Sequence, residues 1–396
     1  MKSVLYILVI PIITLFACQP VQKPLDQLIE EQLQFAVEQY KLMDNTLPDS
    51  VCPRSYDPKQ DKLITSGPGW WCSGFFPGSL WYLYEYSGDT TIREIAIRRN
   101  ALLEKEKYNK GTHDLGFMLY NSFGNGLRID QTDGYDKILI AGAQSLISRF
   151  NTSTGCIRSW DNPKWMFPVI IDNMMNLEYL FWATRETGDS VFRNIAISHA
   201  DKTLENHFRN DFSSWHVVDY DTITGIPRNK QTAQGYSDES AWARGQAWGL
   251  YGYTVLYGET NDPRYLNQAI KIAGFMLEHP NMPEDLVPYW DFNAPNIPNE
   301  PWDASAAAIL CSALIELSGF VEPEEADFYL SKAEKILYSL SSNDYRAKAG
   351  TNGNFILKHS VGSLPGNSEV DVALTYADYY FIESLMRMKN VLDTME

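Results

Sequence analysis

Two aspartates stand in surroundings that suit acid–base chemistry. Asp172 lies within the apolar run 167–175, and we predict that it occupies the first turn of a helix begun by Pro168. Burial raises the pKa of a carboxyl group and a helix N-terminus lowers it, so a second carboxylate close by would tip the balance upward. Asp114, in the sequence THDLGF, is the natural candidate for that second carboxylate. Structural roles stay open: a complement to the helix dipole for Asp172 and a helix cap for Asp114.

The segment 236–253, YSDESAWARGQAWGLYGY, carries a second set of candidate residues. Arg244, Trp248 and Tyr251 recur at i, i+4 and i+7 and so share one helix face, with Trp242 nearby. A guanidinium between indole rings suits an anionic ring compound, because it can grip a carboxylate while the aromatic rings stack on a sugar face. An amphipathic core helix with a snorkelling arginine is the structural alternative.

The same segment predicts a helix that packs closely against a neighbour. Ser237 and Asp238 have the side chains that cap a helix N-terminus, so we expect the helix to open there. Gly245, Gly249 and Gly252 fall at i, i+4 and i+7. Each interior glycine costs a helix up to about 1 kcal/mol. A stripe of them therefore indicates close packing against another helix.

Other polar residues receive plainer interpretations. Asp303 and Asp371 precede apolar stretches and are predicted to be helix caps, and Asp291 is left open as a minor pocket residue. His216 follows Trp215 in a short apolar stretch, where a lone histidine is more often a core residue than a catalyst. Motifs for a nucleophilic serine, for phosphate or dinucleotide binding and for a metal-binding histidine pair are absent. The sequence thus predicts no cofactor and no metal, and paired carboxylates among aromatic residues point to sugar chemistry.

The composition narrows the class of partner. The net charge of −17, without a basic stripe, argues against nucleic acid. Aromatic residues make up 13% of the chain, which is typical of carbohydrate-handling proteins and also of large helical cores. Cys52, Cys72, Cys156 and Cys311 are scattered, without metal-binding spacing. We expect buried free thiols rather than a Cys52–Cys72 bridge, because a chain this long can fold on its core alone.

The N-terminus predicts export. An apolar run over residues 4–16 follows Lys2, too short to span a bilayer and typical of a signal peptide. It ends in Leu15-Phe16-Ala17-Cys18, which resembles a bacterial lipobox. We predict a lipoprotein signal peptide over 1–18, a tether over 19–30 and a single catalytic domain over 31–396. The protein would sit in the periplasm, with the membrane contacted only through an N-terminal lipid anchor; an ordinary signal peptide ending in cysteine is the alternative.

A helical hairpin recurs along the chain. The clearest copies cover residues 80–96, 177–196 and 251–270, and weaker ones cover 304–319 and 371–388. In each copy the first helix is apolar nearly all round and must be buried, whereas the second is amphipathic and can face water. Stacking such hairpins with the buried helices innermost gives an all-α toroid, an α/α barrel. Strand signals are sparse, at 215–220 and 355–359.

In such a toroid the loops that enter the buried helices share one end. Polar and aromatic residues just before each buried helix should therefore converge on one pocket. These segments are 70–77, 113–117, 168–173, 234–248, 288–291, 302–303 and 367–371, and they are rich in Trp, Asp and His.

From about Trp70 to its C-terminus the chain resembles the unsaturated glucuronyl hydrolases, glycoside hydrolase family 88. The markers are SGFFPGSLWYLYEYSGD (73–89), HDLGFMLYNSFGNG (113–126), IIDNMMNL (170–177), SDESAWARGQAWGLYGY (237–253) and VDVALTYADYYFIESLMR (370–387). The resemblance implies an (α/α)6 barrel and, as substrates, lyase-generated oligosaccharides with a 4,5-unsaturated uronic acid at the non-reducing end. It implies Asp172 as the catalytic aspartate and Asp114 as its partner. The pocket residues that it implies are Trp71, His216, Gln234, Trp242, Arg244 and Trp248.

The mechanism that the resemblance implies is hydration of a double bond. Asp172 would protonate C4 of the enol ether and activate a water that adds at C5, and the resulting hemiketal would open and expel the neighbouring sugar. Asp114 would hold ring hydroxyls and keep Asp172 protonated through like-charge coupling. The sequence leaves two roles for Arg244, a contact with the uronate carboxylate or a structural ion pair.

Two other functions stay open at this point. The sister activity on unsaturated rhamnogalacturonan fragments, family 105, shares the barrel and an aspartate acid/base. A non-catalytic glycan-binding lipoprotein would explain the lipobox and the aromatic residues, although not a buried Asp172 beside Asp114. The sequence does not identify the glycosaminoglycan; polar loops without strong basic character favour lightly sulfated or unsulfated disaccharides.

Overall fold

The structure is a computed structural model that describes residues 23–395, with only the backbone of Met395. The predicted signal peptide, lipobox Cys18 and the first part of the predicted tether lie outside the described residues. Helix α1 begins at Leu25 and buries Leu28 and Ile29, so the end of the predicted tether, 25–30, belongs to the folded body. Across residues 23–395 no helix is long and apolar enough to cross a membrane.

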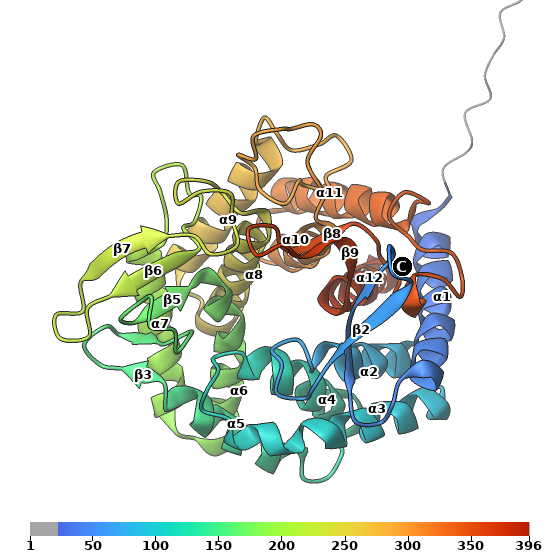
Figure 1. Ribbon diagram of the computed structural model, residues 1–396, viewed down its shortest axis with the longest axis horizontal. Coiled ribbons are helices and arrows are strands. Elements are labelled where there is room, and N and C mark those ends of the chain that lie inside the picture. The colour runs from blue at the N-terminus through green and yellow to red at the C-terminus, as the bar shows by residue number, and fades with distance from the viewer. Residues whose placement is uncertain (1–22, 396) are drawn as a thin grey trace, which may run out of the picture.

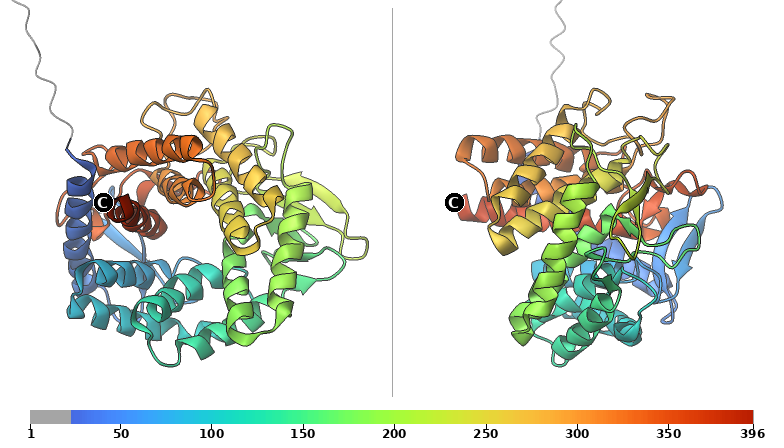
Figure 2. Two further views of the ribbon diagram at one scale, coloured as in Figure 1. Left: turned by 180° about the vertical axis from the view of Figure 1, so that it is seen from behind. Right: turned by 90° about the vertical axis from the view of Figure 1, so that its left-hand side faces the viewer.

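The helices form a ring with an inner and an outer layer (Figures 1 and 2). The inner elements are α2 (Phe75–Ser87), η2 (Gly116–Gly124) with α4 (Asn125–Asp130), α6 (Leu177–Thr187), α8 (Ala243–Thr260), α10 (Ala304–Ser318) and α12 (Thr375–Met395). The outer helices are α1 (Leu25–Thr46), α3 (Thr90–Leu103), α5 (Tyr135–Ile147), α7 (Ser190–Asn206), α9 (Pro263–Glu278) and α11 (Pro323–Ser341). Neighbouring inner elements contact one another in a closed circuit from α2 through η2, α6, α8, α10 and α12 back to α2.

The inner helices are buried nearly all round and the outer helices on one face only, as predicted. Helix α10 is buried along almost its whole length, and α8 is buried from Ala243 to Leu256. Helices α9 and α11 bury only one face each, which is the pattern of an amphipathic surface helix. The apolar inner helices therefore supply the core, and the outer helices cover it.

The turns between paired helices use the predicted chemistry. Gly88 and Gly188 end α2 and α6 at φ of 64° and 74°, in the left-handed region where glycine avoids the Cβ clash. Asp89 and Asp189 then cap α3 and α7 by accepting the backbone N–H two residues on, at 2.8 and 2.9 Å. In both hairpins a Gly-Asp pair therefore ends the first helix and starts the second.

Three small antiparallel sheets, with more strands than the sequence indicates, accompany the ring. Their strand orders are β2-β1-β9-β8, β3-β4 and β5-β6-β7. The strands are β1 (Cys52–Asp57), β2 (Lys62–Ser66), β3 (Phe150–Asn151), β4 (Cys156–Ile157), β5 (Pro168–Ile170), β6 (Val217–Tyr220), β7 (Pro227–Gln231), β8 (Ser360–Ser363) and β9 (Ser368–Leu374). The right-hand view of Figure 2 places β1 and β2 towards one end of the ring and the C-terminus at the other.

Several local predictions need correction. The predicted strand 215–220 is confirmed as β6, but 355–359 forms only a single bridge at Leu357. The helix predicted from Ser237 begins at Ala243 instead, because hydrogen bonds to Asp291 and from Arg209 hold residues 236–240 in a turn. Pro168 opens strand β5, and Asp371 lies in β9 with φ of 57°, not at a helix cap. Cys52, Cys72, Cys156 and Cys311 are free and buried, as predicted.

Candidate active site

Asp172 is held at the end of a strand by backbone pairing. Strand β5 pairs with β6, and the short 3-10 helix η3 (Ile171–Asn176) follows at once. The N–H of Ile171 donates to the carbonyl of His216 at 3.0 Å, which places His216 beside Asp172. The predicted first-turn position of Asp172 is therefore correct, but in η3 rather than in a longer helix.

The Asp172 carboxyl is buried and incompletely bonded. Its side chain is 13% exposed, and Oδ2 has no hydrogen-bond partner within the described residues. The pKa of Asp172 is raised to about 7, chiefly by burial and in part by Asp114, while the Arg244 charge, the Asp172 backbone N–H and the nearby Trp248 side chain lower it. Burial is thus the main cause, and like-charge coupling to Asp114 adds to it. A carboxyl group with such a pKa can give and take a proton near neutral pH.

His216 presents a neutral N–H donor to Asp172. Its Nδ1 accepts hydrogen bonds from the backbone N–H groups of Ala233 and Gln234, both at 3.1 Å, so this bonding pattern assigns the single proton of a neutral ring to Nε2. Nε2 lies 3.7 Å from Oδ2 of Asp172. Burial, with the charge of Arg244, lowers the pKa of His216 to about 3. The ring therefore remains neutral and faces the carboxyl with an N–H group.

Asp114 lies in a turn before η2 and does not cap a helix with its side chain. Oδ2 accepts the Thr112 hydroxyl at 2.7 Å, and Oδ1 lies 3.2 Å from Nε2 of the buried His113. Nδ1 of His113 bonds the carbonyl of Ser159 at 2.8 Å. The Ser159 hydroxyl also accepts the N–H of Ile170 at 3.0 Å, so one serine links the segments of both aspartates.

Arg244 forms a structural ion pair. It is 1% exposed and donates to Oδ2 of Asp303 at 2.8 Å and to the carbonyl of Gly362 at 2.7 Å, with a further bond to the carbonyl of Val361. Trp242 and Tyr376 lie over its guanidinium at 4.6 and 5.2 Å. Asp303 caps α10 as predicted, by accepting the N–H of Ser305. Of the two roles left open for Arg244, the structure shows the ion pair.

The remaining predicted site residues lie around the segments that carry Asp114 and Asp172. Gln234 donates to the Gly362 carbonyl at 3.0 Å, and the Trp242 ring lies 4.6 Å from the His216 ring. Trp248 is completely buried, with its centroid 5.2 Å from Phe117. Trp71 is partly exposed. Its ring also contacts Phe117, with centroids 5.5 Å apart, and packs on Tyr376 at 4.9 Å. Of the two, only Trp71 has exposed ring surface for a sugar.

The glycine stripe on α8 brings η3 close to the helix. A Cβ at Gly252 would lie 2.5 Å from the Cβ of Met174, and one at Gly249 would lie 3.5 Å from the side chain of Ile171. Both neighbours belong to η3, the element that carries Asp172. The predicted close packing is confirmed. Tyr251, predicted to share the face of Arg244, instead bonds Glu383 and Arg387 deeper in the ring.

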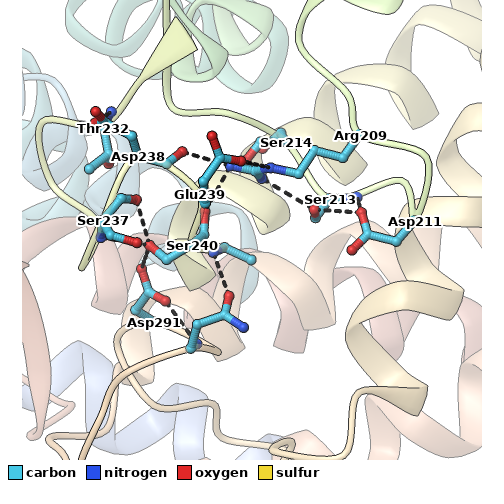
Figure 3. Close-up of polar contacts among 12 residues, drawn as sticks. Arg209, Asp211, Ser213, Ser214, Thr232, Ser237, Asp238, Glu239, Ser240 and Asp291 are labelled. Atoms are coloured by element: carbon cyan, nitrogen blue, oxygen red, sulfur yellow. Dashed lines mark hydrogen bonds and ion pairs between the residues drawn. The ribbon is translucent and has the colours of Figure 1, made fainter.

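Hydrogen bonds to Asp291 and from Arg209 hold the loop that carries Gln234 and Trp242 (Figure 3). Asp291 is fully buried and accepts the N–H of Tyr236 at 2.9 Å and the hydroxyl of Ser240 at 2.6 Å. Arg209 donates to the carbonyls of Asp238 and Ser240 at 2.8 and 3.3 Å. These bonds explain why Ser237 and Asp238 do not open α8.

Sequence reasoning left out His113, Ser159 and Arg209 as site residues. No local pattern marks Ser159 or Arg209, because the bonds that tie them to the site join remote positions, as from Ser159 to His113 and from Arg209 to Asp238. His113 was adjacent to a candidate and could have been included. Within residues 23–395 no group of three or more His, Cys, Asp or Glu side chains is arranged to hold a metal ion.

Comparisons with known proteins give consistent relatives. No protein-family model matches the chain. It is 50% identical over 325 residues to an unsaturated glucuronyl hydrolase of Formosa agariphila, covering 81% of this chain and 80% of that protein. It is 32% identical over 368 residues to an unsaturated chondroitin disaccharide hydrolase of Streptococcus pyogenes, covering 91% and 90%. A crystal structure of an unsaturated glucuronyl hydrolase specific for heparin matches with a TM-score of 0.91 and 48% identity, covering 93% of this chain and 98% of that one.

Proposed function

This chain belongs to the unsaturated glucuronyl hydrolases, glycoside hydrolase family 88, and we propose that it removes the unsaturated uronic acid from glycosaminoglycan fragments. Its substrates are oligosaccharides that polysaccharide lyases leave with a 4,5-unsaturated uronic acid at the non-reducing end. The observation that carries the proposal is the buried Oδ2 of Asp172, which lacks a hydrogen bond within the described residues and faces the N–H of His216. In this proposal the two-layered ring is the (α/α)6 barrel of the family.

Asp172 is the proton donor of the reaction. Its carboxyl gives a proton to C4 of the double bond, and the carboxylate then takes a proton from the water whose oxygen bonds to C5. The product is a hemiketal at C5. Its ring C5–O bond breaks to leave a ketone, and the hemiacetal exposed at C1 collapses to an aldehyde and releases the next sugar. Asp172 ends each turnover protonated, so no external acid or base is consumed.

The neighbouring residues adjust and position the proton donor. The Nε2–H of His216 stabilises the carboxylate that forms when Asp172 gives up its proton. Asp114, held by the Thr112 hydroxyl, accepts hydrogen bonds from substrate hydroxyls. Arg244 acts as a positioning residue, because its bonds fix the carbonyls of the segment around Gly362.

Heparin-type fragments are the substrate that the relatives favour. The match to the heparin-specific enzyme has 48% identity, whereas the chondroitin disaccharide hydrolase of Streptococcus pyogenes shares 32%. This choice differs in emphasis from the sequence-based expectation of lightly sulfated or unsulfated disaccharides, and both are testable with one set of compounds.

The test is an incubation with unsaturated heparin, chondroitin and hyaluronan disaccharides. The C4=C5 bond conjugated to its carboxylate absorbs in the ultraviolet, so hydration is followed as loss of absorbance together with release of the second sugar. The fastest loss is expected with a heparin disaccharide. Persistent absorbance with all three would refute the proposal, and turnover of unsaturated rhamnogalacturonan fragments would then identify the sister activity.

We also propose that the protein is a periplasmic lipoprotein anchored through Cys18. The support is the apolar run 4–16 followed by the lipobox-like Leu15-Phe16-Ala17-Cys18. Labelling of cells with a radioactive fatty acid should mark the wild-type chain and not Cys18→Ser. Equal labelling of both chains, or of neither, would refute the anchor.

A further inference from the structure

The inner helices line a cavity of about 490 Å³ away from Asp172 and Asp114. We call it the lower cavity; its defining residues are Tyr120, Glu178, Trp182, Tyr251, Glu383 and Arg387. They come from η2, α6, α8 and α12, so the inner layer itself builds the cavity. The proposed hydrolase chemistry uses none of these residues.

A layer of aromatic rings separates the lower cavity from the Asp172 site. Phe75, Phe117, Trp248 and Tyr380 contact one another in a closed circuit, with successive centroid distances of 5.4, 5.2, 5.3 and 5.9 Å. These aromatic side chains come from α2, η2, α8 and α12, which lie around the circle of inner helices. Tyr251 contacts Tyr380 at 5.6 Å from the cavity side. A molecule in the lower cavity would therefore lie outside the proposed active site.

The cationic groups of the cavity wall already have partners. Arg128 binds Glu85 at 2.8 Å, and Arg185 pairs with Glu259. Arg387 pairs with Glu316 and donates to the Tyr251 hydroxyl at 2.8 Å. No arginine on the wall is thus left to attract an anion.

Glu178 differs from the other acidic group on the wall. Glu383 accepts hydroxyl hydrogen bonds from Tyr82 at 2.9 Å and from Ser312 at 2.6 Å. Glu178 makes no hydrogen bond or ion pair with any described residue, 23–395. The pKa of Glu178 is raised to about 8, chiefly by burial and in part by Glu316, while the charge of Arg387 opposes the rise. A positive charge placed beside Glu178 would lower this pKa and stabilise the ionised carboxylate.

The rings next to Glu178 complete an acidic aromatic corner. Trp182 lies one helical turn after Glu178 on α6, and the Tyr120 ring lies 6.2 Å from the Trp182 ring. Arg387 covers Tyr251 at 5.1 Å, but among residues 23–395 no cation lies over Tyr120 or Trp182. An electron-rich ring face beside a carboxyl group that has no ion-pair partner among the described residues suits an ammonium group, whose charge would favour the ionised carboxylate.

We propose that the lower cavity is a second binding site, which takes a small hydroxylated organic cation. Its ammonium group lies at Glu178 against Tyr120 and Trp182, and its hydroxyl reaches the polar groups around Asn121 and Asn125. The site is independent of the hydrolase reaction, because the aromatic layer separates the two.

The test is isothermal titration of the purified full chain with choline. The uncharged isostere 3,3-dimethyl-1-butanol has the same shape and hydroxyl, so it isolates the contribution of the charge. We expect one choline to bind per chain, at least about tenfold more tightly than the isostere. No choline binding, or equal binding of the two compounds, would overturn the proposal.

Variants locate the site. Glu178→Gln keeps the size of the side chain and should weaken choline binding at least about tenfold, with a Tm no lower than that of the wild type because a desolvated carboxyl is removed. Glu38→Gln, on outer helix α1, is the matched control and should change nothing. Asp172→Asn should also bind choline normally. Loss of binding in Asp172→Asn with retention in Glu178→Gln would place choline in the active site and overturn the proposal.

Discussion

Asp172 and Asp378 share an electrostatic signature and differ in bonding. Burial raises the pKa of each to about 7. Asp378, on α12, is completely buried and accepts the backbone N–H groups of Ile356 and Leu357, each at 2.9 Å. Asp172 keeps one oxygen without a hydrogen bond among the described residues. A raised pKa alone therefore does not mark a catalytic acid; a free oxygen directed at the reacting group is also required.

Exchange of each carboxyl for an amide should separate the two roles. Asp172→Asn should lower kcat roughly 10²–10⁴-fold with little loss of stability, because it removes the transferable proton. Asp378→Asn should keep kcat per folded molecule and lose about 1–3 kcal/mol of unfolding free energy, because the amide NH2 group meets a backbone N–H. Ultraviolet assays and urea unfolding measure the two effects. A near-normal rate for Asp172→Asn would remove Asp172 as the acid.

Loss of Arg244 should damage the structure around Asp172 more than any change at Asp378. Arg244→Gln leaves Asp303 buried without its cation, which costs about 3–5 kcal/mol. Arg244→Lys keeps the charge but cannot reach Asp303, Val361 and Gly362 together, so a loss of about 1–3 kcal/mol is expected. Denaturant unfolding measures both. Equal stability of Arg244→Lys and wild type would contradict a structural role for the planar guanidinium.

The pH dependence of rate should report Asp172 and not Asp378. Because Asp172 must be protonated to act, kcat/KM should fall about tenfold per unit as pH rises above about 7. Asp378→Asn should leave this limb where it is. A limb that moved in Asp378→Asn would show that the two carboxyls are coupled.

The same shifts predict the sign of the pH dependence of stability. The folded pKa of Asp172 and of Asp378, about 7, lies above the ordinary 3.8, so each carboxyl disfavours folding progressively as pH rises from about 4 to about 7. As pH rises across that window, the difference in unfolding free energy between each variant, Asp172→Asn or Asp378→Asn, and wild type should shift in favour of the variant. Urea unfolding at both ends of the window measures the difference, and a constant difference would contradict the shift.

Two glycines give the smallest effects, of opposite sign. Gly252→Ala places a Cβ 2.5 Å from Met174 in the element of Asp172, so we expect a loss of about 1–3 kcal/mol and a reduced kcat. Gly274→Ala, on outer helix α9, meets nothing within 4 Å and should gain up to about 1 kcal/mol from helix propensity. Thermal unfolding and the ultraviolet assay measure both. A stabilised Gly252→Ala would show that η3 can move away from α8 without loss.

Local patterns in the sequence were enough to predict the helical hairpins. The left-handed Gly88 followed by the capping Asp89, and the same pair at Gly188 and Asp189, need only neighbours within a few residues. The sheet that joins β1 to β9 escaped prediction because these two strands pair across most of the chain, although β1–β2 and β8–β9 are local hairpins. The start of α8 was misplaced for the same reason, since Asp291 and Arg209 hold residues 236–240 in a turn.

The sequence by itself determined which residues are apolar, where helices pair and that Asp172 lies in an apolar run, because these depend on residue type and short spacing. Only the tertiary structure decided which donors reach each carboxyl. Arg244 was free to bind a substrate or a protein carboxylate until the fold brought Asp303, Val361 and Gly362 to it. Oδ2 of Asp172 lacks a hydrogen bond among the described residues because the fold places its neighbour, Nε2 of His216, 3.7 Å away. Long-range hydrogen bonds are set by packing, which no local spacing encodes.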